Sequence, residues 1–152
     1  MVPADPSGSL ADQLIHLTRR LHRAQRRQLE PIGVTPAQAR LLRTLSHCPE
    51  PPRMADLAQR LDVVPRAVTT LVDGLEQRDA VRRVADPASR RVTRIELTED
   101  GRALLGRLRR ARREAAEELL APLTEEQRTQ LGALLAPLAP PGHPDPPGGR
   151  TR

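Results

Sequence analysis

The sequence predicts a mainly α-helical fold with a small β-hairpin, and three patterns support this prediction. Apolar residues recur at steps of three and four through most of the chain, which is typical of the buried face of a helix. Between residues 81 and 97 the pattern changes to alternation around an Asp-Pro turn signal, which predicts a hairpin. Two short amphipathic segments precede the hairpin and are joined by about four residues, which is the layout of a helix-turn-helix. The predicted fold class is therefore a winged helix-turn-helix flanked by N- and C-terminal helices.

Composition restricts the class of protein further. The 152 residues suffice for one ordinary domain, and the net charge of +6 includes 25 basic residues that are all arginine. No apolar run reaches the roughly 18 residues of a membrane span and no secretory signal is visible, so we expect a soluble cytoplasmic protein. The single cysteine, Cys48, excludes an internal disulfide and a thiolate-rich zinc site. Since Phe, Tyr and Trp are absent, a base-stacking platform and an aromatic cation cage are excluded too.

The first two helices are predicted from apolar spacing and from their end signals. The first covers about residues 8–29, has its arginines mostly off the leucine stripe, and ends before Gly33. Thr35 then supplies an N-cap with Gln38 three residues later, which predicts the start of a second helix that stops before Pro49.

The next two helices make up the predicted helix-turn-helix. A short helix covers about residues 54–60, and Pro65 opens a longer one that ends near Arg78. One face of the longer helix is apolar, so we expect the opposite face to point outward, as in a DNA-reading helix. That outward face carries Arg66, Thr69, Thr70 and Asp73.

The hairpin follows directly. Its predicted strands cover residues 81–84 and 92–97, and residues 86–89 form the turn. A cluster of arginines in this segment is what a polyanion-binding wing needs, although charge alone fits a solvated surface hairpin equally well. The segment 82–94 contains one acidic residue, Asp86, and the arginines of the cluster are Arg82, Arg83, Arg90, Arg91 and Arg94.

Two further helices complete the chain. Thr98 caps one that covers about residues 99–120, and a capping box at Thr124 starts a last helix rich in leucine. Residues 1–7 and the tail 140–152, which is rich in proline and glycine, are predicted to be disordered.

Five stretches stand out together, in this order: Thr35–Gln38, Met54–Leu61, Arg66–Glu76, Asp86–Arg91 and Ile95–Gly101. In order and spacing they resemble the MarR (multiple antibiotic resistance regulator) family of bacterial winged-helix transcription regulators. The resemblance implies a single domain over residues 8–139. Within it, residues 35–98 would form the DNA-binding lobe, and residues 8–34 and 99–139 would form dimerisation helices.

The resemblance also implies partners. A homodimer would bind double-stranded DNA at a pseudo-palindromic operator, most often as a repressor of nearby efflux, stress or degradation genes. A small-molecule effector, often phenolic or drug-like, would bind between the dimer region and the DNA lobe and release the protein from DNA. No cofactor, metal or membrane is expected. The leucines expected at the dimer interface are Leu10, Leu14, Leu17, Leu119, Leu131, Leu134, Leu135 and Leu138.

The exposed residues of the winged helix-turn-helix then have expected roles. The helix 65–78 would enter the major groove, with Arg66 at a base edge or a phosphate. The two threonines would contact phosphate or a thymine methyl group, and Asp73 would either accept from cytosine or steer the arginine. Arg90 or Arg91 would lie in or beside the minor groove, where narrow A·T-rich tracts attract arginine.

Five positions differ from what is usual in the family. Ser89 stands where an acidic residue commonly holds the wing arginine, and Val64 stands where a capping serine is common. Asp62 and Asp79 replace glycines, and aspartate tolerates a left-handed backbone there. Ala39 stands where relatives often carry a large aromatic residue, so the effector cleft is expected to be reshaped.

Other functions have weaker support. An enzyme is not expected, because the glutamates of the helix 99–120 lie among arginines. His16 and His22 do not share a helix face, and Cys48 lies away from the reactive cysteine of some relatives, so neither a metal site nor a redox sensor is favoured. The main alternative is a helical interaction module of winged-helix fold that no longer binds DNA specifically.

Overall fold

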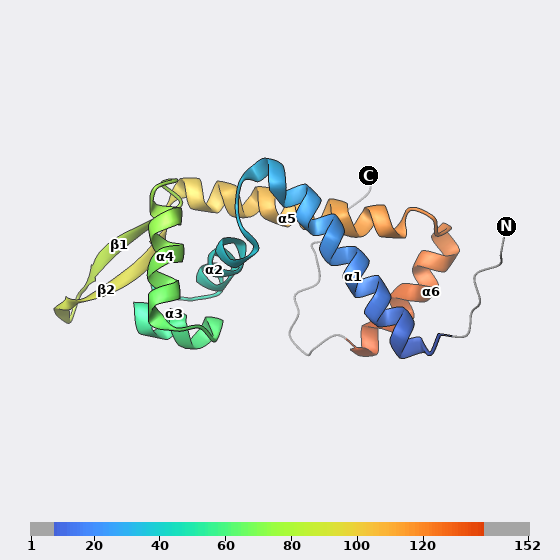
Figure 1. The fold of residues 1–152 in the computed structure, drawn as a ribbon, viewed down its shortest axis with the longest axis horizontal. Coiled ribbons are helices and arrows are strands. Elements are labelled where there is room, and N and C mark those ends of the chain that lie inside the picture. Colours follow the sequence, from blue (N-terminus) through green and yellow to red (C-terminus); the bar gives the residue numbers. More distant parts are fainter. Residues whose placement is uncertain (1–7, 139–152) are drawn as a thin grey trace, which may run out of the picture. The chain divides into compact units, whose positions relative to one another are not determined.

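The computed structural model describes residues 8–138, and Figure 1 shows their helices and the single hairpin. The predicted class, mainly α-helical with a β-hairpin wing, is confirmed. The segments predicted to be disordered, 1–7 and 140–152, lie outside the described residues. In chain order the elements are α1 (Leu10–Leu29), the 3-10 helix η1 (Glu30–Ile32), α2 (Pro36–Ser46), α3 (Met54–Leu61), α4 (Pro65–Glu76), β1 (Val81–Asp86), β2 (Ser89–Leu97), α5 (Glu99–Leu120), α6 (Glu125–Leu135) and the 3-10 helix η2 (Ala136–Leu138).

The chain divides into two compact units, one up to Glu118 and one from Leu119. The first unit holds α1 to α4, the hairpin and nearly all of α5, and the second holds α6 and η2. None of the helices between residues 8 and 138 is long and apolar enough to cross a membrane.

The core of the first unit consists of aliphatic side chains. It joins α2, α3, α4, the hairpin and α5, so burial of apolar surface fixes the helix-turn-helix against both the hairpin and the long helix. The largest fully buried side chains are Leu41, Leu42, Leu57, Leu61, Leu75, Ile95, Leu108, Val68, Val72 and Val81.

Polar caps begin the helices at the predicted positions. The Thr35 hydroxyl accepts a hydrogen bond from the backbone N–H of Gln38 at 3.2 Å, and the glutamine side chain accepts from the Thr35 amide in return. The same capping box begins α6 at Thr124. At the start of α5 the Thr98 hydroxyl accepts from the Gly101 amide at 2.9 Å. These bonds satisfy N–H groups that a helix start leaves without an intrahelical partner, and the three predicted starts are confirmed.

The two aspartates at predicted turns do adopt a left-handed backbone. Asp62 has φ 54° and ends α3, and Asp79 has φ 55° between α4 and β1. The expectation that aspartate can replace glycine at these turns is confirmed. Just before the second turn, α4 ends at Glu76, so its predicted end near Arg78 is two residues too far. The Arg78 guanidinium instead donates to backbone carbonyls at the end of η1, at 2.5 and 2.8 Å.

The hairpin is longer than predicted and its turn is tighter. β1 continues to Asp86 and β2 begins at Ser89, so Pro87 and Ala88 alone connect them. The predicted strand limits at residues 84 and 92 are therefore wrong. Apolar alternation could not reveal the added residues, because they are small or polar: Ala85, Asp86 and Ser89 pair through their backbones, and Arg90 and Arg91 lie between two pairs.

Candidate nucleic-acid interface

The helix-turn-helix has the predicted division of faces. The apolar residues of α3 and α4 pack into the core, so the opposite face of α4 lies in solvent. The four residues predicted for the reading face lie together on that exposed side, as Arg66, Thr69, Thr70 and Asp73.

The polar groups on this face differ in whether they already have a partner within the protein. The Thr69 hydroxyl donates to the carbonyl of Pro65 at 3.3 Å, and the Thr70 hydroxyl donates to the carbonyl of Arg66 at 3.2 Å. Both threonines therefore direct their hydroxyl hydrogens at their own helix. The Arg66 guanidinium forms no ion pair with any residue of the described chain, so its charge is available to a ligand.

Asp73 is joined to the hairpin. Arg83 of β1 donates to its carboxylate at 2.5 Å and also bonds Glu76, one helical turn further along α4. The hydrogen bond to Asp73 is the main cause that raises the pKa of Arg83. The predicted DNA contacts of Asp73 and Arg83 remain predictions, and in this structure the pair fastens the reading helix to the first strand.

Arg82 is paired across the hairpin. It lies opposite Glu96 in the register, and its Nε donates to that carboxylate at 2.8 Å. The bond lowers the pKa of Glu96. Because both side chains contact solvent, the pair is weak and a polyanion could replace the glutamate.

Arg90 and Arg91 occupy a bulge next to the turn. Ala85 pairs with Thr93 and the following residue of β1 pairs with Ser89, so three residues of β2 lie between two consecutive pairs. Such a bulge re-aims the side chains it contains. Both arginines are exposed, and neither has an ion-pair partner among residues 8–138.

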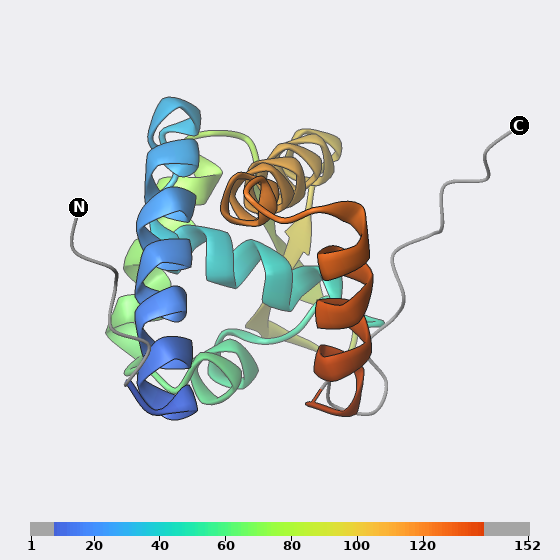
Figure 2. The ribbon, with the colours of Figure 1, turned by 90° about the vertical axis from the view of Figure 1, so that its right-hand side faces the viewer.

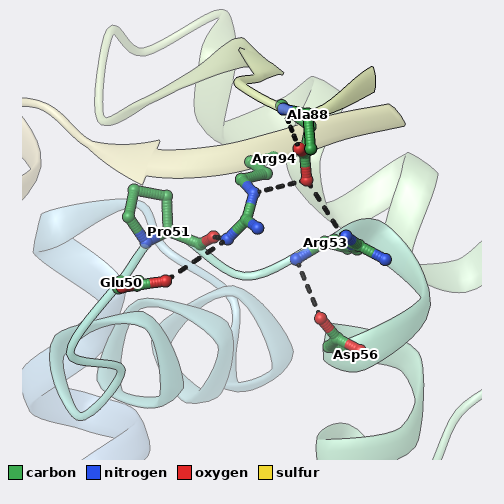
Figure 3. Close-up of polar contacts among 7 residues, drawn as sticks. Glu50, Pro51, Arg53, Asp56, Ala88 and Arg94 are labelled. Carbon is green, nitrogen blue, oxygen red and sulfur yellow. Dashed lines mark hydrogen bonds and ion pairs between the residues drawn. The ribbon is translucent and has the colours of Figure 1, made fainter. Parts of the chain in front are cut away.

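The hairpin is held to the helix-turn-helix by three residues that we call the wing brace: Asp86, Arg94 and Arg53. Figure 3 labels the two arginines and draws their bonds as dashed lines. The Asp86 carboxylate, only 1% exposed, accepts from Arg94 Nε at 2.8 Å and from Arg53 Nε at 3.2 Å. It also accepts from the backbone amide of Ala88 at 2.8 Å. Arg94 extends the network by donating to the carbonyl of Pro51 at 2.8 Å. The Ala88 amide, followed by the Arg94 guanidinium, lowers the pKa of Asp86.

The wing brace changes the interpretation of two sequence positions. The predicted DNA contact of Arg94 remains a prediction, and in this structure its guanidinium donates to Asp86 and to the Pro51 carbonyl. Ser89 stands where an acidic residue commonly holds the wing arginine. In this chain the carboxylate that bonds Arg94 of the hairpin belongs to Asp86, three residues earlier. Sequence reasoning missed Arg53, which lies at the N-cap of α3. The available signal was the isolated Asp86 within an arginine-rich segment, since a lone acid there needs partners.

A second feature is a cleft of about 380 Å³ lined by α1, α2 and α5; Figure 2 shows α2 next to α1 and below α5. Five of its ten lining residues are arginines, none is acidic, and we call it the arginine cleft. Burial lowers the pKa of Arg43, and the nearby charges of Arg112 and Arg40 lower it further. Ala39, which stands where an aromatic residue is common, lies in the wall. The lining residues are His22, Arg23, Gln25, Arg26, Leu29, Pro36, Ala39, Arg40, Arg43 and Arg112.

Cys48 is half-buried at the end of α2, and its thiol donates to the carbonyl of Thr44 at 3.2 Å. Within the described part of the chain, no group of three or more His, Cys, Asp and Glu residues could hold a metal ion.

Comparisons with known proteins match this geometry. The MarR family model matches residues 34–93. The HTH-type transcriptional repressor MdtR of Bacillus subtilis is 33% identical over 111 residues, which cover 73% of this chain and 71% of MdtR. The crystal structure of the B. subtilis YusO protein has a TM-score of 0.75 at 29% identity, covering 85% of this chain and 91% of YusO. A mutant of Staphylococcus aureus MepR bound to an oligodeoxyribonucleotide shares the fold, with a TM-score of 0.71 at 22% identity over 87% of this chain and 96% of that one.

An exposed reading helix beside an arginine-tipped hairpin, together with these relatives, defines a DNA-binding transcription regulator of the winged-helix class. Within that class, the chain belongs to the MarR family. The resemblance seen in the sequence is thereby confirmed.

Proposed function

We propose that the chain acts as a homodimer that represses nearby genes by binding a pseudo-palindromic operator in double-stranded DNA. In each half-site α4 enters the major groove, and the hairpin tip lies in or beside the minor groove. One observation carries the proposal: Arg66, Arg90 and Arg91 have no ion-pair partner in the described chain, whereas the other three wing arginines do. Unpaired guanidinium groups at two separate points of one lobe fit the phosphates and base edges of a duplex.

Exposed leucines support the homodimer. Leu10 on α1 is 82% exposed, and further exposed leucines follow it at helical spacing and recur on α6 and η2. In each unit, apolar side chains exposed to water at helical spacing are typical of an interaction surface, and a two-fold dimer would space its half-sites by about 10 base pairs. The exposed members of the predicted interface are Leu10, Leu14, Leu17, Leu134, Leu135 and Leu138; Leu119 and Leu131 are half-buried.

Salt-dependent binding tests the proposal. The full chain is titrated onto labelled DNA fragments from around its own gene, with fluorescence anisotropy as the measurement. We expect Arg91→Ala to reduce the slope of log K against log salt by about one unit for each protomer, because one phosphate contact is lost. The control Arg110→Ala removes the same charge from the exposed side of α5, and its slope should equal that of the wild type.

The outcomes separate the two functions considered for this fold. An unchanged slope in Arg91→Ala would contradict the wing contact. Absence of binding to every fragment, at low salt and without ligand, would favour a helical interaction module that no longer binds DNA specifically. Since the proposed target is the bacterial chromosome, we expect the protein at the nucleoid in the cytoplasm.

We also propose that the arginine cleft binds a small anionic effector. Burial is the main cause that lowers the pKa of Arg43, and repulsion from Arg112 and Arg40 lowers it further. Since no acid in the wall neutralises these arginines, an anion would relieve the repulsion. The planar guanidinium suits a carboxylate because it can donate two parallel hydrogen bonds. Aliphatic groups such as Leu29 would pack against the apolar part of the effector.

A further inference from the structure

We infer that Val64 is a specificity-determining residue that recognises the methyl group of a thymine in each operator half-site. The inference rests on the proposed function, because it requires α4 to enter the major groove. Val64 is the N-cap of α4 and lies two residues before Arg66, so it belongs to the end of the helix that reaches furthest into a groove.

The exposure of Val64 is exceptional in its surroundings. The residue is 68% exposed. Among residues 35–98, all of which the structure describes, it is the only Val, Leu, Ile or Met in the exposed class. Single exposed apolar residues are common on protein surfaces, so exposure alone would not assign a role.

The position of Val64 supplies the second observation. An N-cap favours Ser, Thr, Asp or Asn, since the side chain can accept from the first backbone N–H groups of the helix. The chain uses such caps at Ser9, Thr35 and Thr124, but no side-chain hydrogen bond caps α4. At the start of the reading helix the chain therefore lacks a stabilising bond and presents an isopropyl group to solvent instead.

The neighbouring groups define what this end of α4 can recognise. Thr69 and Thr70 bond their hydroxyl hydrogens to carbonyls of their own helix, which leaves oxygen lone pairs and methyl groups for a base. Only Arg66 offers unpaired N–H donors on this reading face. In the major groove, thymine presents a methyl group and guanine presents two acceptors that fit a guanidinium. The face therefore matches a thymine close to a guanine.

Replacing thymine with deoxyuridine tests the inference, because this change removes only the methyl group. A duplex is first selected from a random 30-base-pair pool with the full wild-type chain, and each thymine is then replaced in turn. We expect one thymine in each half-site to be sensitive, with about fourfold weaker binding per methyl lost. The Val64→Ser variant should bind the thymine duplex and the deoxyuridine duplex with equal affinity. The Val64→Thr variant keeps one methyl group and should retain part of the preference for thymine.

Thermal stability separates recognition from a structural role. Val64→Ser restores the missing cap, so we expect its Tm to rise by about 2–4 °C while the thymine preference is lost. A lower Tm in Val64→Ser would indicate that valine is there for packing and would overturn the inference. Equal affinity of the wild type for thymine and deoxyuridine at every position would overturn it too, and the proposed function would stand. If selection enriches no duplex, the proposed function itself fails.

Discussion

The arginines of the hairpin divide into two groups according to their partners. Arg83 and Arg94 are bonded to carboxylates within the fold, and Arg82 is paired on the surface. Arg90 and Arg91 in the bulge lack such partners among the described residues. The ion pairs within the fold orient the hairpin, and Arg90 and Arg91 at its tip are left to bind a ligand.

We predict that Asp86→Asn lowers the Tm by several degrees near neutral pH, because Arg94 and Arg53 lose a buried charged acceptor. The pKa of Asp86 is lowered in the folded state, so its ionised form stabilises the fold above the unfolded pKa of about 3.9. That contribution disappears as the pH falls through the lower folded value.

Circular dichroism melts between pH 3 and pH 8 provide the measurement. The difference between wild type and Asp86→Asn should be constant above about pH 5 and should shrink below about pH 4. The exposed Glu114 offers a control, and Glu114→Gln should leave the Tm nearly unchanged at pH 7. A difference that persists undiminished at the acid end would show that the charge of Asp86 is not what stabilises the hairpin.

At the scale of residues, the sequence predicts which side chains are exposed better than it predicts which ones pair. Helical spacing correctly places Arg66 on the exposed face of α4, because the opposite face is apolar. The contact of Asp86 with Arg53 cannot be read in this way, since Arg53 lies 33 positions away and reaches it only through the packing of the hairpin against the helix-turn-helix. The bond between Arg83 and Asp73 depends likewise on how β1 packs beside α4.

At the scale of elements, two glycines of α5 offer opposite predictions. A Cβ at Gly101 would lie 1.9 Å from the carbonyl oxygen of Ala80, so α5 could not keep its close approach to the start of β1. We predict that Gly101→Ala destabilises the protein by about 1–3 kcal/mol or more. At Gly106 a Cβ would meet nothing within 4 Å, and Gly106→Ala should stabilise by about 0.5–1 kcal/mol through helix propensity alone.

Urea unfolding measures both variants on the same helix. Gly106→Ala is the matched control for helix propensity. The opposite signs of the two changes in the free energy of unfolding therefore isolate the close approach of Gly101 to Ala80. Equal stabilisation by both alanines would contradict the close packing described for this end of α5.

Elements with polar caps are predicted well from the sequence, and the hairpin less so. The starts of α2, α5 and α6 follow from Thr35, Thr98 and Thr124, since each hydroxyl acts within its own turn. The length of the hairpin depends on backbone pairing around a bulge, which leaves little trace in the pattern of side chains.

At the scale of the whole molecule, we predict that an anion in the arginine cleft weakens DNA binding. Benzoate at millimolar concentration should release a labelled duplex, whereas neutral benzamide, which has nearly the same shape, should not. Arg43→Met keeps much of the side-chain volume and removes the charge, so about tenfold more benzoate should be needed. Release by both compounds alike would contradict an anion site and would indicate apolar recognition instead.

The ring-free core has a consequence for spectroscopy. The four histidines carry the only aromatic rings in the chain, so its methyl groups experience almost none of the ring-current shifts that spread the spectra of ordinary proteins. A benzenoid ligand would introduce a ring current that no Phe, Tyr or Trp side chain of the protein supplies. Methyl groups of Leu29 and Ala39, which line the arginine cleft, should then shift where His22 is the one aromatic side chain in the lining. The missing aromatic residues thus make the protein a sensitive NMR reporter of an aromatic effector.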